Sequence, residues 1–260
     1  MKIRKHYLTK NRCYTSGRTI TPKGIMVHSL GVAQPDVNVF LKSWNTITVS
    51  KCVHAFVTPD EVVQTLPWNR RGWHAGGKAN DTHISMELLE PSGHKYAKNS
   101  GTMLNYDVAK NTEYFNKIYQ QTVDLCTFLC KEYNLPSSSV ITHAEGFKFG
   151  IATNHADVMH WFPKHGKSMN DLRADIDAQL HVPTKTITPA SSKADITWLQ
   201  NQLNKLVPGY TIEVTGTYDS RTRIAVLLYW EQLGWGKHMR DNGLAVGKAT
   251  RTALAQNRKE

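Results

Sequence analysis

The sequence has no apolar run long enough to cross a lipid bilayer, which takes roughly 20 residues. Its basic start, MKIRKHYLTKNRCY, is not followed by the apolar segment that a signal peptide requires. We therefore expect a chain that is made in the cytoplasm without a signal peptide and is not inserted in a membrane. A target outside the membrane would need another route of release.

Cysteine is scarce, with four residues and no CxxC pair, which excludes a structural zinc finger. Cys126 and Cys130 lie four apart, on one face of a predicted helix. Free cysteine behaves as a small hydrophobic residue that is readily buried. We expect buried thiols in a reducing compartment rather than disulfides.

Acidic residues are also few, with 21 Asp and Glu against 32 Lys and Arg, giving a formal net charge of +11. Such a charge favours a polyanionic partner, either a nucleic acid or an anionic wall polymer. A solvated surface with a lysine excess is the third interpretation. No helix-turn-helix, finger or aromatic RNA-binding motif is visible, which disfavours nucleic acid.

Apolar and helical patterns alternate along the first two thirds of the chain. β-Branched and apolar runs predict strands at 24–29, 52–57, 62–66, 83–89 and 140–143. Helical periodicity marks 36–44, 107–133 and a segment that begins near Met169. Together they predict an α/β domain, with a mixed central sheet flanked by helices, over residues 1–180.

The composition changes after this domain. Residues 181–193, HVPTKTITPASSK, are rich in Pro, Thr and Ser and predict a linker. Residues 194–260 have helical patterns, including one apolar stripe of Trp198, Leu199, Leu203 and Leu206. We expect a small all-α C-terminal domain there.

Histidines at strand ends are the main chemical signal. His28 ends the first predicted strand, His143 ends a later one, and Asp157 lies between His155 and His160. Two histidines and one carboxylate would supply three zinc ligands and leave a fourth position for water, as in catalytic zinc sites. A single histidine, taken alone, is usually a surface residue or a core residue with its hydrogen bonds satisfied.

Long ordered matches accompany these residues: WHAGG at 73–77, DTHISMELLEP at 81–91 and ITHAEGFKFGIATNHADVMHWFPKHGKSM at 141–169. Over most of residues 20–180 the chain resembles the type 2 N-acetylmuramoyl-L-alanine amidases, whose fold is shared with peptidoglycan recognition proteins. The resemblance implies one zinc ion per chain, held by His28, His143 and Asp157. Many relatives have cysteine at the third place, and His160 is the rival for it here.

The resemblance also implies catalytic roles. Glu87 matches the acidic residue that takes a proton from water and passes it to the departing amine. His155 stands where relatives often have a lysine that stabilises the oxyanion. Glu90, beside Pro91, is expected at the surface. Three further residues are expected to line the substrate groove, with a tight turn as the alternative: Trp73, His74 and Asn80.

The tail resembles the helical peptidoglycan-binding domain of wall hydrolases, at 199–206, 216–226 and 243–254. The resemblance as a whole implies zinc-dependent hydrolysis of the amide bond between N-acetylmuramic acid and L-alanine in peptidoglycan. A chain of this organisation resembles a phage endolysin, which acts on the cell wall after holin-dependent release. The alternative is a recognition protein of the same fold that binds peptidoglycan without cutting it.

Overall fold

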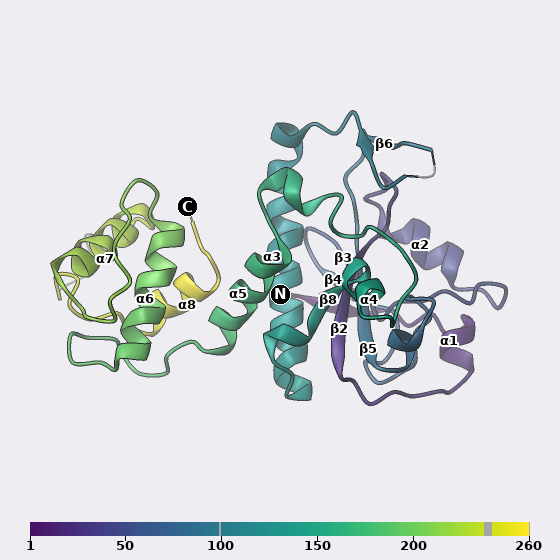
Figure 1. The fold of residues 1–260 in the computed structure, drawn as a ribbon, viewed down its shortest axis with the longest axis horizontal. Coiled ribbons are helices and arrows are strands. Elements are labelled where there is room, and N and C mark those ends of the chain that lie inside the picture. Colours follow the sequence, from purple (N-terminus) through teal and green to yellow (C-terminus); the bar gives the residue numbers. More distant parts are fainter. Residues whose placement is uncertain (99, 237–240, 260) are drawn as a thin grey trace. The chain divides into compact units, whose positions relative to one another are not determined.

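The computed structural model describes residues 1–98, 100–236 and 241–259 (Figure 1). The chain divides into two compact units, Met1–Ile176 and Asp177–Glu260. Within the described ranges, no helix is long and apolar enough to cross a membrane.

A six-stranded sheet forms the centre of the first unit. Its order is β1 (Ile3–Lys5), β4 (Val62–Gln64), β3 (Ala55–Val57), β5 (His83–Leu88), β2 (Gly24–Ser29) and β8 (Val140–Thr142). Within this sheet β3 and β4 pair antiparallel, and the other four pairs of neighbouring strands are parallel. The predicted mixed sheet is therefore confirmed, with β1 as an edge strand that the sequence pattern does not reveal.

Helices and short elements surround this sheet. The α-helices are α1 (Arg12–Thr15), α2 (Val37–Trp44), α3 (Val108–Tyr133), α4 (His143–Lys148) and α5 (Met169–Leu180). The 3-10 turns are η1 (Lys78–Asp81), η2 (Ser137–Ser139) and η3 (Phe162–His165), and β6 (Lys95–Tyr96) pairs with β7 (Met103–Leu104).

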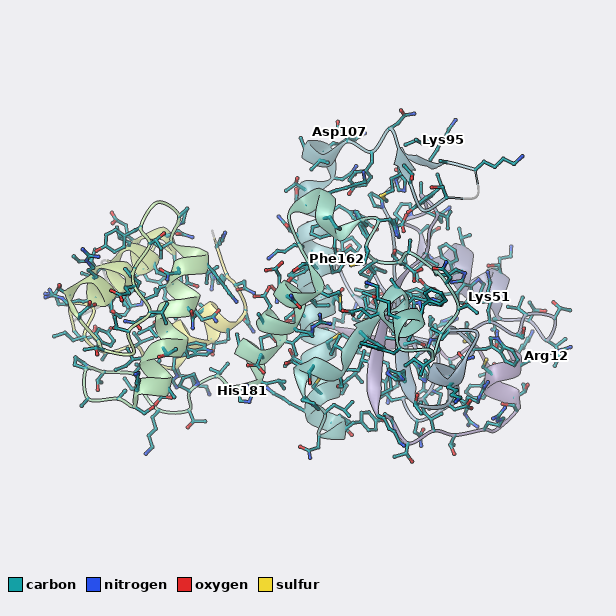
Figure 2. The ribbon with its side chains drawn as sticks, in the orientation of Figure 1. Arg12, Lys51, Lys95, Asp107, Phe162 and His181 are labelled. Carbon is teal, nitrogen blue, oxygen red and sulfur yellow. The ribbon has the colours of Figure 1, made fainter. Side chains whose placement is uncertain are left out.

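Local chemistry explains where the two predicted helices start and stop. The side chain of Asp36 accepts a hydrogen bond from the backbone of α2, and Asp107 does the same for α3 (Figure 2). The long helix α3 ends at Asn134, which takes the left-handed conformation with φ of 51°. These caps fix the ends of both helices within one residue of the predicted ones.

The register of the sheet puts three side chains on one face. Glu87 on β5 pairs with His28 on β2 and with Phe56 on β3. Directly paired residues of neighbouring strands point to the same side of a sheet. The rings of Phe40 and Trp44 on α2 lie 5.6 and 5.1 Å from that of Phe56. Helix α2 therefore packs on the face that carries His28 and Glu87.

The second unit is helical, as predicted. It contains α6 (Lys193–Leu206), α7 (Ser220–Gln232) and α8 (Lys248–Ala255) around a core of its own. Leu199, Leu203 and Leu206 of the predicted stripe are buried in that core, and Trp198 packs against it partly buried.

The stretch expected to be a linker differs from the expectation. Ile187 is fully buried in the core of the second unit and pairs with Val246. The buried guanidinium of Arg251 donates hydrogen bonds to the carbonyls of Pro183 and Thr184. One apolar residue gives no periodicity, so the sequence pattern could not show that this stretch packs on the helices.

His54, at the centre of the first unit, is a fully buried histidine with a fixed neutral form. Its Nδ1 accepts a hydrogen bond from the backbone N–H of Ser85, so Nε2 carries the hydrogen and donates to the carbonyl of Arg70 at 2.6 Å. Burial lowers the pKa of His54 to about 4, from 6.5. Protonation of His54 at Nδ1 would place its new N–H against the backbone N–H of Ser85, so that two donors face each other.

We expect this histidine to make the protein acid-sensitive. Because the folded pKa lies below the unfolded one, stability is complete above pH 6.5 and is lost as the pH falls toward 4. Between pH 7 and pH 4.5, His54 alone should reduce the free energy of unfolding by about 2–3 kcal/mol. Urea unfolding of the metal-free protein measures it. His54→Asn keeps an acceptor for Ser85 without titrating, so it should flatten the pH dependence; an unchanged slope would contradict the assignment.

Candidate active site

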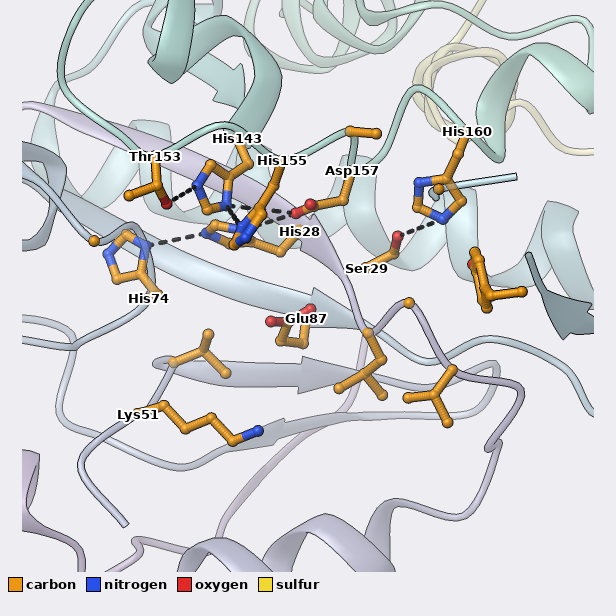
Figure 3. A pocket seen from close by; sticks show the side chains of 18 of the residues that line it. His28, Ser29, Lys51, His74, Glu87, His143, Thr153, His155, Asp157 and His160 are labelled. Atoms are coloured by element: carbon orange, nitrogen blue, oxygen red, sulfur yellow. Dashed lines mark hydrogen bonds and ion pairs between the residues drawn. The ribbon is translucent and has the colours of Figure 1, made fainter. Parts of the chain in front are cut away.

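Three residues predicted as metal ligands come together at the carboxyl ends of β2 and β8 (Figure 3). His28 Nδ1 lies 3.0 Å from Asp157 Oδ2 and 3.2 Å from His143 Nδ1. His143 Nδ1 and Asp157 Oδ2 are 3.8 Å apart. His143 is the first residue of α4, where a capping box between Thr142 and Glu145 fixes the turn from strand to helix.

The geometry and charge of this cluster fit zinc. Tetrahedral zinc with bonds of about 2.0–2.1 Å separates its ligand atoms by about 3.3 Å, close to these distances. Burial alone would raise the pKa of Asp157, but the hydrogen bond from His28 and the charges of both histidines outweigh it and lower that pKa. Burial, with the His28 charge, lowers the pKa of His143 to about 4. The two lowered pKa values favour an ionised Asp157 and a neutral His143, which are the forms of these side chains that bind a metal.

Glu87 faces the same cleft from the carboxyl end of β5. Its Oε2 is buried and has no hydrogen-bond partner among the described residues. Burial raises the pKa of Glu87 well above its ordinary value, and the charges of Asp157 and Glu90 add to this, partly offset by Lys51. A carboxyl group with a raised pKa and an oxygen that has no partner among the described residues is suited to taking up and returning a proton.

The cleft around these groups has a volume of about 960 Å³. Trp73 lines it and has half of its surface exposed; its predicted contact with substrate stays a prediction. Sequence reasoning missed Lys51 and Tyr96, which also line the cleft. Nothing in their local pattern separates them from surface residues, because they lie on different segments that only the fold brings together.

His155 lies at the open side of the metal cluster. Its Nδ1 is 3.3 Å from His143 Nδ1, and the side chain is exposed to solvent. It does not belong to the group formed by His28, His143 and Asp157. This position suits a residue that contacts a substrate bound at the cluster.

Two residues expected to line the groove have other partners. His74 does line the cleft, but its Nδ1 is 3.0 Å from His28 Nε2. Asn80 is buried and is not among the residues lining the cleft. Its Oδ1 accepts hydrogen bonds from the backbone N–H groups of His74 and Ala75, at 2.8 and 2.9 Å. We therefore assign Asn80 a supporting position behind the cleft wall.

The position of Glu90 differs from the expectation, and His160 lies apart from the three candidate ligands. Glu90 was expected at the surface, yet it is fully buried, because it accepts hydrogen bonds from the Gly31 backbone and the Tyr96 hydroxyl. His94 and His160 contact the same carboxylate, at 3.2 and 3.3 Å. His160, the rival third ligand, therefore turns to Glu90 and lies outside the metal cluster.

Comparison with known proteins gives a family match. The sequence profile described as N-acetylmuramoyl-L-alanine amidase matches residues 18–165, more than half of the chain. The bifunctional autolysin of Staphylococcus aureus (strain MSSA476) is 25% identical over 176 residues, 68% of this chain and 13% of the autolysin. That of Staphylococcus epidermidis is 25% identical over 170 residues, 65% of this chain and 12% of its own length. The chain thus spans about an eighth of these relatives.

Solved structures agree with the fold. The Staphylococcus aureus hydrolase AmiA, in complex with its ligand, has a TM-score of 0.53 at 20% identity, over 68% of this chain and 82% of that chain. The catalytic domain of XlyA has a TM-score of 0.50 at 19% identity, over 68% of this chain and 99% of that chain. Both cover about the length of the first unit, and they establish its architecture.

Proposed function

Because this chain belongs to the N-acetylmuramoyl-L-alanine amidase family, we propose that it is a zinc-dependent enzyme acting on bacterial peptidoglycan. The bond cut is the amide between N-acetylmuramic acid and the L-alanine of the stem peptide. One observation carries the proposal: a cluster of two histidines and one aspartate shares a cleft with Glu87, whose buried Oε2 has no hydrogen-bond partner among the described residues.

Each residue of the cleft has a role in this proposal. His28, His143 and Asp157 would hold one zinc ion, which polarises a bound carbonyl and activates water. Glu87 would accept the proton of the attacking water and return it to the leaving amine. His155, exposed beside His143, would donate a hydrogen bond to the oxyanion. Trp73 would pack against the substrate at the cleft wall.

Mass spectrometry of digested cell wall tests the proposed bond. The expected products carry new free L-alanine amino ends, without new reducing ends on the sugars. A recognition protein of the same fold, which binds peptidoglycan without cutting it, would yield no products. The presence of all three candidate ligands together with Glu87 favours the enzyme over that alternative.

We also propose that the second unit binds peptidoglycan and that the whole chain serves as a phage-type endolysin. The resemblance of its sequence at 199–206, 216–226 and 243–254 to a wall-binding helical domain, and its separate core, support an anchoring role. The net charge of +11 supports additional attraction to anionic wall polymers. Expression in a bacterial host tests the endolysin role: lysis should require a co-expressed holin, and lysis without one would contradict holin-dependent release.

Removing the second unit should impair wall lysis far more than the chemistry. All candidate catalytic residues lie in Met1–Ile176, so a chain of residues 1–180, which keeps α5 whole, should cleave a small soluble muropeptide at a near-normal rate. Without its anchor it should lyse whole wall roughly tenfold or more slowly, because tethering raises the local substrate concentration. Parallel assays on both substrates measure the difference.

The complementary fragment must include the stretch that packs on the helices. A chain of residues 181–260 keeps Ile187 in its core and should sediment with purified wall without any hydrolytic activity. High salt should weaken any residual wall binding of residues 1–180 first, since long-range attraction between exposed charges is screened. Equal loss of activity on both substrates would contradict a separate anchoring unit.

A further inference from the structure

We propose that the segment Trp73–Gly77 is a positioning element that fixes the ring orientation and hydrogen placement of both histidine ligands. The segment reaches His28 through the His74 side chain, and it reaches His143 through Thr153 and the carbonyl of Ala75. This inference rests on the proposed zinc site and extends it from the ligands to the residues behind them.

The first contact orients His28. Its Nδ1 faces Asp157 and His143, so its Nε2 must carry the hydrogen when a metal occupies Nδ1. That hydrogen points at His74 Nδ1, 3.0 Å away, and the two rings meet edge to face (Figure 3). His74 thereby accepts the hydrogen bond and leaves the lone pair of His28 directed at the cluster.

The second contact orients His143 in the same way. Its Nε2 lies 3.2 Å from the hydroxyl of Thr153, which in turn donates to the carbonyl of Ala75 at 3.2 Å. Because the hydroxyl hydrogen goes to Ala75, the Thr153 oxygen is left to accept from His143. The backbone N–H of Thr153 also donates to Ala75, at 2.9 Å, so the chain is held there independently of the hydroxyl.

The segment is held rigidly enough for this task. Trp73 exchanges two backbone hydrogen bonds with Cys52, both of 3.0 Å, and Asn80 accepts from His74 and Ala75. Gly77 passes so close to the neighbouring loop that a Cβ would lie 2.5 Å from the carbonyl oxygen of Ile151. In the motif WHAGG, glycine at position 77 lets the backbone pass close to Ile151. The side chain of His74 and the carbonyl of Ala75 then make the contacts toward His28 and Thr153.

Zinc affinity tests the contact with His28, measured by competition with a chromophoric chelator. His74→Leu removes the acceptor and should weaken zinc binding roughly 10- to 100-fold. His74→Asn retains an acceptor oxygen near the position of Nδ1 and should recover most of that affinity. The visible absorption of the cobalt-substituted protein should change in the leucine variant and remain near wild type in the asparagine variant.

Two substitutions of Thr153 test the contact with His143 independently. Thr153 is exposed, so either substitution is compatible with folding. Thr153→Val keeps the shape and the backbone bond but removes the hydroxyl, and should weaken zinc binding roughly tenfold. Thr153→Ser should bind like wild type. The inference would be wrong if the wild type binds one zinc ion but the two His74 variants bind it equally well, and the two Thr153 variants do so too. That result would leave the proposed function standing. A wild-type chain that binds no zinc would overturn the proposed function and this inference with it.

Discussion

Glu87→Gln should lower amidase turnover by roughly two orders of magnitude or more while leaving about one zinc ion per chain. Glutamine keeps the size of the side chain but cannot accept a proton from water. Glu87 lies outside the cluster of His28, His143 and Asp157, so the metal should stay. Steady-state cleavage of a soluble muropeptide and metal analysis of the same sample give the two readouts.

A matched control separates this effect from a general loss of a carboxylate. Glu113 on α3 is exposed and pairs with Lys117 one helical turn away, so Glu113→Gln should leave turnover and zinc content unchanged. Loss of zinc from Glu87→Gln would instead make Glu87 a ligand. Unchanged turnover would remove it from the reaction altogether.

His28→Ala should lose both the metal and the lytic activity. It removes one of three ligands and leaves the carboxylate of Asp157 without the hydrogen bond that accompanies it. In the wild type, chelation should abolish lysis and added zinc should restore it. Zinc should also raise the midpoint of thermal unfolding of the wild type but not of the variant, because a ligand stabilises only the state that binds it.

The control for this substitution is His6→Ala, which removes an exposed histidine outside the cleft. It should retain zinc, the stabilisation by zinc and full lysis. Full lytic activity of a metal-free wild type would contradict the role assigned to the cluster, whatever the behaviour of the variants.

Much of the fold could be predicted because its central strands have strong local patterns. β2 contains the apolar run Ile25–Val27, and polar and apolar residues alternate along β5; the predicted ends of both strands agree closely with the structure. β1 could not be predicted, because Ile3–Lys5 is short and mostly polar and becomes a strand only by pairing with β4. The packing of Ile187 escaped prediction for a similar reason, since its partners lie some 60 residues away.

The candidate site likewise contains residues that the sequence could identify and residues that it could not. His28 and His143 could be identified because strand ends and family matches both mark them, and the structure brings them together with Asp157. The partners behind them could not, because Thr153 meets Ala75 across 78 positions of sequence. A sequence motif marks a residue without showing its contacts. Asn80 was therefore expected in the groove, whereas its side chain binds the backbone of His74 and Ala75.

The buried carboxylate of Glu90 has a consequence for how the cleft responds to substrate. It joins the loop at Gly31, the β6 hairpin through His94 and Tyr96, and the loop bearing His160. Outward movement of any one of these loops would leave the buried carboxyl group of Glu90 with fewer hydrogen-bond partners, so we expect the loops to move together. If the proposed function holds, we expect stem peptides to be selected by their fit to a largely preformed cleft rather than by movement of a single loop.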